Sequence, residues 1–124
     1  MNINAKFINV LKAILANPNE IQDVVRDGDE YYFKFRNQFL SVNFRERTEP
    51  SIGNYSVFVY PRWQGTVEDL KGVGSLPDAV ELVSFHQGQF EAANEQDLFD
   101  QIYRAVQSRH LNIDKVFDAI LGGN

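Results

Sequence analysis

The sequence predicts a two-layer α+β sandwich, in which an antiparallel sheet of about five strands carries an N-terminal helix and two C-terminal helices on one face. Two observations predict this fold class. Apolar residues recur at helical spacing at both ends of the chain, and the segments between them alternate apolar and polar side chains and are joined by short turns. With 124 residues, 44% hydrophobic and 23% charged, residues 1–124 are expected to form a single globular domain.

The first predicted element is an amphipathic helix near the N-terminus. Its apolar residues recur at intervals of three and four between Ile3 and Leu15. Asn17 is predicted to end it, because the residue before a proline is disfavoured in the helical conformation. Residues 20–26 are the next predicted strand.

Asp27 and Gly28 are predicted to form the turn of a first hairpin. The register of this hairpin stays open. A two-residue loop aligns Val24 with Tyr31, and a three-residue loop aligns Val25 with Tyr31.

Residues 29–47 are predicted to form a second hairpin with a two-residue turn at Asn37-Gln38. Pairing outward from that turn places Phe33 opposite Val42 and collects apolar residues on one face. The other face collects polar, basic and aromatic residues. The apolar face is expected to be buried. The second face is interpreted as an exposed contact surface, and the alternative that the long loop or the final helix covers it stays open.

Further strands are predicted at residues 55–60 and 79–86. The stretch between them, residues 61–78, reads as a long loop with one or two helical turns from Thr66 to Lys71. Long loops in compact domains often carry function, and this one contains the single tryptophan of the chain.

Two helices are predicted in the C-terminal region. Asn94 is the expected N-cap of the first, and residues 108–110 interrupt its apolar pattern. The last helix carries apolar residues at helical spacing, and we expect its Val116 and Phe117 to lie in the core.

A contact surface is predicted on the outer face of the sheet, where aromatic and basic side chains gather. Such mixtures are enriched at protein interfaces. The predicted partner-binding residues are Tyr32, Lys34, Arg36, Arg45, Phe58 and Tyr60 on the face, with Arg62 and Trp63 at its rim.

The net charge is −5, and the acidic surplus lies in the C-terminal third. Residues 78–124 carry eight acidic and three basic side chains, whereas residues 1–77 are neutral. This distribution disfavours a nucleic-acid partner or an anionic membrane. The apolar residues near the N-terminus are interrupted by polar ones, so neither a signal peptide nor a membrane partner is expected, and a cytoplasmic location is predicted.

Known catalytic and cofactor motifs are absent from the sequence. The chain has no cysteine, and its histidines, His86 and His110, have no metal-ligand spacing. We therefore expect no metal, no cofactor and no catalytic residue, although enzyme activity is not decided by the sequence.

Three functional hypotheses follow. The first is a small acidic protein-binding module of inhibitor, immunity, adaptor or chaperone type, which uses the outer sheet face and the 61–78 loop. In size, acidity and α+β character the chain is similar to type III secretion chaperones; no motif carries that similarity, and those proteins place a helix mid-chain where this sequence predicts a loop.

The second hypothesis is a small-ligand-binding protein or enzyme with a pocket between the 61–78 loop and the sheet. This pocket would use Tyr60, Arg62, Trp63 and His86. The third is self-association into a homodimer, either between the sheet face and the acidic helical face or through an edge strand.

Overall fold

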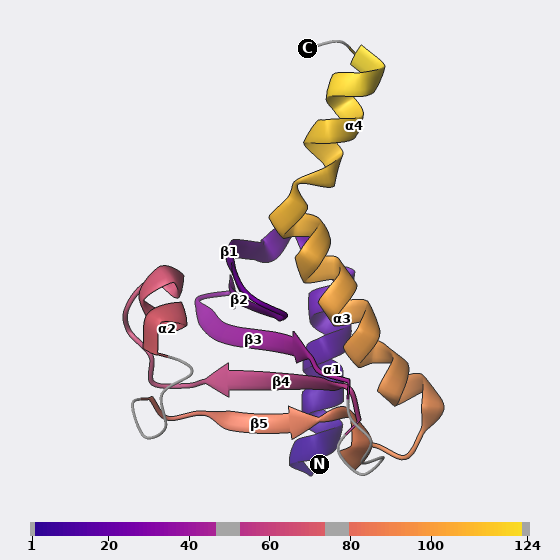
Figure 1. Cartoon of the computed structure of the whole chain (residues 1–124). Helices are drawn as coiled ribbons and strands as arrows, with labels where there is room; N and C mark the ends of the chain where they lie inside the picture. Colours follow the sequence, from indigo (N-terminus) through magenta and orange to yellow (C-terminus); the bar gives the residue numbers. More distant parts are fainter. Residues whose placement is uncertain (1, 47–52, 74–79, 123–124) are drawn as a thin grey trace.

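The computed structural model describes residues 2–46, 53–73 and 80–122. Their elements confirm the predicted α+β class with five antiparallel strands (Figure 1). In chain order they are α1 (Ile3–Ala16), η1 (Pro18–Glu20), β1 (Ile21–Asp27), β2 (Glu30–Phe35), β3 (Gln38–Phe44), β4 (Tyr55–Tyr60), α2 (Val67–Val73), β5 (Val83–His86), η2 (Gln87–Gln89), α3 (Ala93–Leu111) and α4 (Ile113–Gly122).

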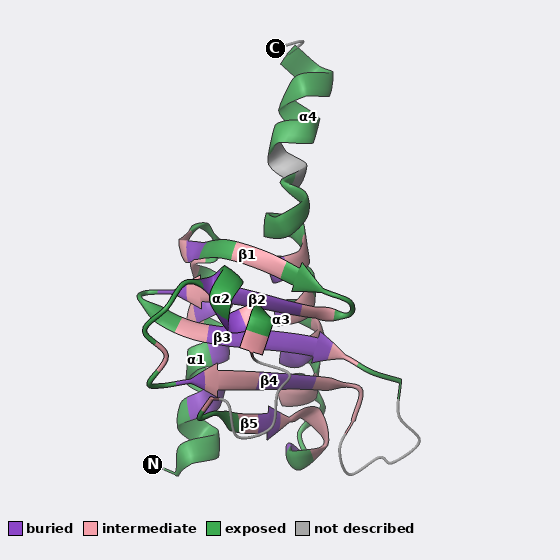
Figure 2. Cartoon of the chain, turned by 60° about the vertical axis from the view of Figure 1, so that its left-hand side comes forward, coloured by how far each residue is buried: buried purple, intermediate pink, exposed green. Residues whose placement is uncertain are grey.

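The sheet is a meander, in which each strand pairs with the next one along the chain in the order β1-β2-β3-β4-β5. The sequence predicts the strands and not their order in the sheet. Figure 2 shows α2 in front of the sheet and α1 and α3 behind it. Both faces of the sheet are therefore at least partly covered, and the sequence predicted cover for one face only.

The main core lies between the sheet and the pair α1 and α3. Helical spacing places Phe7, Leu11 and Ile14 of α1 in this core, and Phe99 and Ile102 of α3 are also fully buried there. The rings of Phe7 and Phe85 stack with centroids 3.8 Å apart, so α1 is packed directly on β5.

The turn between β2 and β3 lies at Arg36-Asn37, one residue earlier than predicted. Both residues have positive φ, at 49° and 63°, as a type I′ turn requires. Phe33 consequently pairs with Leu40 instead of Val42. The predicted register is wrong by two residues, and the face of each side chain is unchanged because strands alternate with a period of two.

A β-bulge distorts β1. Asp23 has φ 57°, and the pairing with β2 shifts between Gln22 and Val25. Arg26 pairs with Tyr31, so neither alignment predicted for this hairpin is correct.

The C-terminal helices differ from the prediction at three points. Helix α3 begins at Ala93 after an Ala92 cap, so Asn94 is not the N-cap. It continues through the predicted break to Leu111 and ends at Asn112, which has the left-handed conformation (φ 56°, ψ 46°). Helix α4 then projects beyond the sheet (Figure 1), and Val116 and Phe117 are exposed instead of lying in the core.

Candidate functional site: an apolar groove beside α1

The outer face of the sheet is covered by α2. Val67 and Leu70 of this short helix are buried against Tyr32 and Tyr60, each of which is only 1% exposed. The prediction that Tyr32 and Tyr60 lie on an exposed face is therefore wrong, and both are covered within this chain. The reason is that the helical turns expected within residues 61–78 bring an apolar side down onto the sheet.

Beneath α2 these tyrosines belong to a buried hydrogen-bond network. The Ser41 hydroxyl donates to Glu30 Oε2 at 2.7 Å and lies 2.9 Å from the Tyr60 hydroxyl. The Tyr32 hydroxyl donates to Glu30 Oε1 at 3.2 Å. Burial raises the pKa of Tyr60 to about 12 and also raises the pKa of Tyr32. Both phenols stay protonated near neutral pH and hold the outer layer together.

The other predicted contact residues do not converge on one surface. Arg36 pairs with Glu20 at 3.0 Å, and Arg62 pairs with Glu81 at 3.3 Å. The side chains at both pairs are largely exposed, so the pairs contribute little to stability.

Lys34, Arg45, Phe58 and Trp63 complete the predicted set. Arg45 is exposed, and Lys34 is half-buried with its ammonium group 5.7 Å from the Phe39 ring. Phe58 and Trp63 are half-buried against the cluster beneath α2. They support the packing of α2 and do not form an open binding face.

An apolar groove lies elsewhere, between α1 and one end of the sheet. Its volume is about 500 Å³. The first wall comes from successive turns of α1, with Ile3, Phe7, Val10 and Ile14. Across it lie apolar residues from the ends of four strands: Phe35, Leu40, Val59, Val83 and Phe85.

The register of the sheet explains why these strand residues meet. Leu40 pairs with Val59, and Val59 pairs with Val83, so the three residues lie in one row across β3, β4 and β5. Side chains in one such row point to the same face. The row continues the apolar face of the sheet past the part that α1 covers.

The charged residues that line the groove are basic. Lys6 and Arg36 belong to its lining, and no acidic residue is found among the described residues that line it. Arg36 is already paired with Glu20, so Lys6 is the basic group that suits a ligand with an apolar side and an acidic group beside it. Arg36 is the one residue of the predicted contact set that lines this groove.

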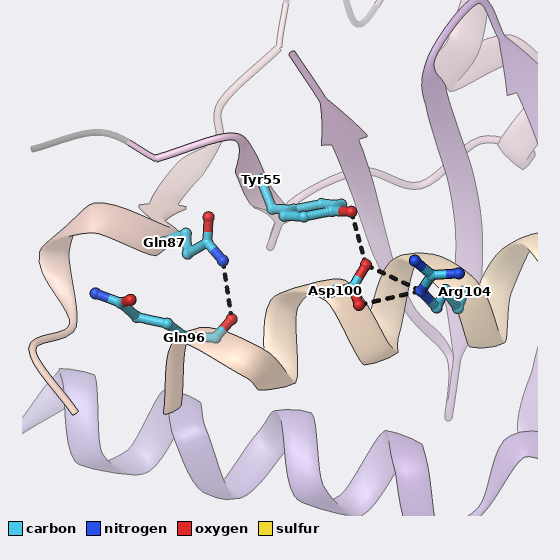
Figure 3. Close-up of polar contacts among 5 residues, drawn as sticks. All are labelled: Tyr55, Gln87, Gln96, Asp100 and Arg104. Carbon is cyan, nitrogen blue, oxygen red and sulfur yellow. Dashed lines mark hydrogen bonds and ion pairs between the residues drawn. The ribbon is translucent and has the colours of Figure 1, made fainter. Parts of the chain in front are cut away.

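A polar cluster on the other side of the molecule ties β4 to α3 (Figure 3). The Tyr55 hydroxyl donates to Asp100 Oδ1 at 2.6 Å, and Arg104 Nε donates to Asp100 at 3.0 Å. Nearby, the Gln87 side chain donates to the Gln96 carbonyl oxygen at 3.1 Å.

The pKa shifts in this cluster argue against acid–base catalysis. The hydrogen bond from Tyr55 is the main cause that lowers the pKa of Asp100, and Arg104 lowers it further. Burial and the carboxylate of Asp100 raise the pKa of Tyr55 to about 12. Neither group is brought toward neutral pH, where a proton-transfer residue works best. The cluster is best understood as a structural tie.

The histidines also have structural surroundings. His86 Nδ1 lies 2.7 Å from Ser56 Oγ, and the His110 ring packs edge-on against Tyr31. Within residues 2–46, 53–73 and 80–122, no group of three His, Cys, Asp or Glu residues could hold a metal ion. In the same ranges, no helix is long and apolar enough to cross a membrane.

The sequence did not reveal the groove because its walls have core composition. Phe7 and Phe35 are buried and Val59 is half-buried, so these residues belong partly to the core and partly to the groove. Val10 was the available signal. It extends the apolar side of the helix between Ile3 and Leu15 beyond the stripe that faces the sheet, and it is exposed.

Comparisons with protein-family models, with curated proteins and with solved structures find no match for this chain. The fold defines an α+β protein with a five-stranded meander, and the functional argument depends on the groove itself.

Proposed function

We propose that this chain is a small protein-binding module that holds an apolar helical segment of its partner in the groove between α1 and the strand ends. The observation that carries the proposal is the open apolar groove, with Val10 and Val83 exposed on its two sides. Contiguous exposed apolar surface marks interaction sites in many proteins.

A helical ligand fits the shape of the site. Along α1 the lining runs from Ile3 to Ile14, which is about 17 Å at the helical rise of 1.5 Å per residue, or three turns. An amphipathic helix of that length presents three or four apolar side chains to such a groove. The walls of the groove are mainly apolar side chains, so recognition of such a helix would depend on apolar packing.

The charge at the groove indicates what kind of partner helix it favours. Lys6 at the rim favours a partner with an acidic residue beside its apolar stripe, because opposite charges speed association and help to fix orientation. Arg36 contributes less, since it is already paired with Glu20. A nucleic-acid partner is not proposed, since the net charge of the chain is −5. The inhibitor, immunity, adaptor and chaperone roles all remain within this class, and a cytoplasmic location stays a prediction.

A small apolar acid is the second candidate ligand. The groove volume of about 500 Å³ falls within the range typical of small-molecule sites, and its rim is basic. The pocket predicted between the 61–78 loop and the sheet is not the basis for this candidate, because Val67 and Leu70 fill the space between α2 and the sheet.

The test compares two neighbouring residues. Val83 lines the groove and is 49% exposed, whereas Leu82 is 41% exposed and is not part of the lining. Val83→Glu and Leu82→Glu therefore introduce the same charge at similar exposure, one inside the site and one outside it.

We expect affinity capture from lysate of the source organism to recover a partner with the wild-type chain and with Leu82→Glu, and to lose it at least tenfold with Val83→Glu. Circular dichroism and thermal melting establish that both variants fold. Equal recovery by all three proteins would exclude the groove as the binding site. The small-ligand candidate is tested by adding dodecanoate and measuring the melting temperature. A rise for the wild type and Leu82→Glu, but not for Val83→Glu, would favour this candidate.

A further inference from the structure

Helix α4 carries an apolar face that the rest of the chain does not cover. Val116, Phe117, Ile120 and Leu121 lie at helical spacing on one side of the helix and are 47–85% exposed. Figure 2 shows the described part of α4 as exposed throughout, projecting from the end of α3. A helix with this much exposed apolar area needs a partner surface.

The groove beside α1 matches α4 in length and composition. Ten residues of helix span about 15 Å, and the groove follows α1 for about 17 Å. Both surfaces are apolar along this length.

One charge pairing is available between the two surfaces. Lys6 lines the groove, and α4 carries the exposed acidic residue Asp118 beside its apolar face. Arg36 is already paired with Glu20, and the exposed Lys115 of α4 offsets Asp118 in net charge, so the match depends on the apolar surfaces. The C-terminal third as a whole holds the acidic surplus of the chain.

The connection to α3 prevents α4 from turning back onto its own groove. Asn112 is the single residue between the two helices, whereas antiparallel helix pairs are joined by loops of two to five residues. The last turn of α3 is also fixed to the sheet, because Arg109 Nε donates to the Ile21 carbonyl oxygen at 3.3 Å and the His110 ring packs on Tyr31.

We propose that α4 of one copy occupies the groove of a second copy, and that the exchange is reciprocal. Each copy carries this groove and this helix, so two equivalent contacts close a twofold dimer in which both grooves are filled. This inference depends on the proposed function, since it names a second copy of this chain as the source of the helix that the groove binds.

The absence of cysteine from the sequence permits a direct test in the full chain. Val10 lies near the middle of the groove and Phe117 near the middle of α4, so the two positions come together whichever way the helix runs. We expect a mixture of Val10→Cys and Phe117→Cys chains, tagged to differ in mass, to form the mixed disulfide under mild oxidation. Leu82→Cys with Phe117→Cys is the matched control and should give at least tenfold less of it.

Sedimentation equilibrium tests the same contact without crosslinking. Wild type and Leu82→Glu should be dimers, whereas Val83→Glu and Phe117→Asp should be monomers. Phe117 is exposed within one chain, so its replacement should not unfold the protein. Mixing the two monomeric variants should restore a weaker dimer, in which the intact α4 of the groove variant enters the intact groove of the helix variant.

Several outcomes would overturn the dimer. A wild type that stays monomeric at high concentration excludes it, and so does a Val83→Glu variant that still dimerises, because α4 would then contact something other than the groove. Absence of a restored dimer on mixing would also overturn it, because an intact α4 and an intact groove would then fail to bind each other. If the dimer is excluded but capture of another partner still depends on Val83, the proposed function stands. If neither dimerisation nor partner capture depends on Val83, both the dimer and the proposed function are rejected.

Discussion

Arg36 and Asn37 set the register of the central hairpin through their backbone conformation. Both have positive φ, which asparagine tolerates and which glycine adopts without steric cost. The sequence signal was Asn37 alone, and it is compatible with either position of a two-residue turn. Arginine is an uncommon residue at positive φ, so local preference pointed to Asn37-Gln38. The apolar alternation could not separate the two registers, because they differ by two residues and keep the same faces.

Replacing Asn37 tests this turn. Asn37→Val should lower the free energy of unfolding by about 1–2 kcal/mol, because a β-branched residue is strained at φ 63°. Asn37→Gly should leave stability nearly unchanged. Urea unfolding measures both, and equal stability of the valine and glycine variants would contradict the turn assignment.

Because the phenol of Tyr60 is buried, we expect the folded protein to lose stability at alkaline pH. Burial raises its pKa from 10.0 to about 12 in the folded chain. Above pH 10.0 the unfolded chain releases the Tyr60 proton while the folded chain keeps it, so stability is full below about pH 10 and falls as pH rises toward about 12. Each proton held in this way contributes a slope of about 1.4 kcal/mol per pH unit.

Tyr60→Phe should reduce that slope, and urea unfolding over this pH range measures it. At neutral pH the variant should lose about 1 kcal/mol, because the Ser41 hydroxyl loses a partner. Tyrosinate absorbance of the folded wild type gives an independent reading. Ionisation of every tyrosine near pH 10 would contradict the burial of Tyr32 and Tyr60.

At the scale of elements, α2 shows what periodicity reveals and what it does not. The sequence predicted helical turns at residues 66–71, and the structure places a helix at Val67–Val73. Alternation along the strands separated the two faces of the sheet correctly. Neither pattern says which face a short helix will cover, because that depends on the path of the chain in three dimensions. The predicted exposure of Tyr32 and Tyr60 was wrong for this reason.

Leu70→Ala should test the cover that α2 provides. Leu70 is fully buried against the outer face, so we expect a loss of about 2–5 kcal/mol and a lower pKa for Tyr60 as water reaches it. Lys71→Ala is the control, since Lys71 pairs with Glu68 at the surface, 3.3 Å apart, and should cost under about 1 kcal/mol. Urea unfolding with tyrosinate titration measures both effects. Equal costs for the two variants would mean that α2 does not seal the outer layer.

For helix α4, too, the sequence predicted the helix but not its surroundings. Its apolar spacing predicted both the helix and one apolar side correctly. The sequence placed that side in the core of the same chain, because periodicity reports that a face is apolar and not which surface covers it.

At the scale of the whole molecule, the α+β class and its five antiparallel strands could be predicted from short turns and terminal helices. The groove could not be predicted, because it arises where α1 leaves part of the apolar face uncovered, and that placement follows from packing against α3. The single-domain organisation of residues 1–124 stays a prediction.

The proposed dimer makes melting depend on concentration. If only folded chains exchange α4, dimerisation stabilises the folded state by mass action. The melting temperature of the wild type should therefore rise as protein concentration rises, and that of Phe117→Asp should stay constant. Calorimetry over a hundredfold concentration range measures the difference, and parallel behaviour of the two proteins would contradict the proposal.

Among the described residues, β1 and β5 are the edge strands of the meander. Strand β1 is bent by the bulge at Asp23, and β5 is only four residues long. Short or bulged edges are poor templates for strand addition, so chains that crowd together have little opportunity to extend the sheet into fibrils. We therefore expect the extra residue in β1 to protect against amyloid-like assembly, and a deletion that straightens this strand should make the protein prone to thioflavin-positive aggregation.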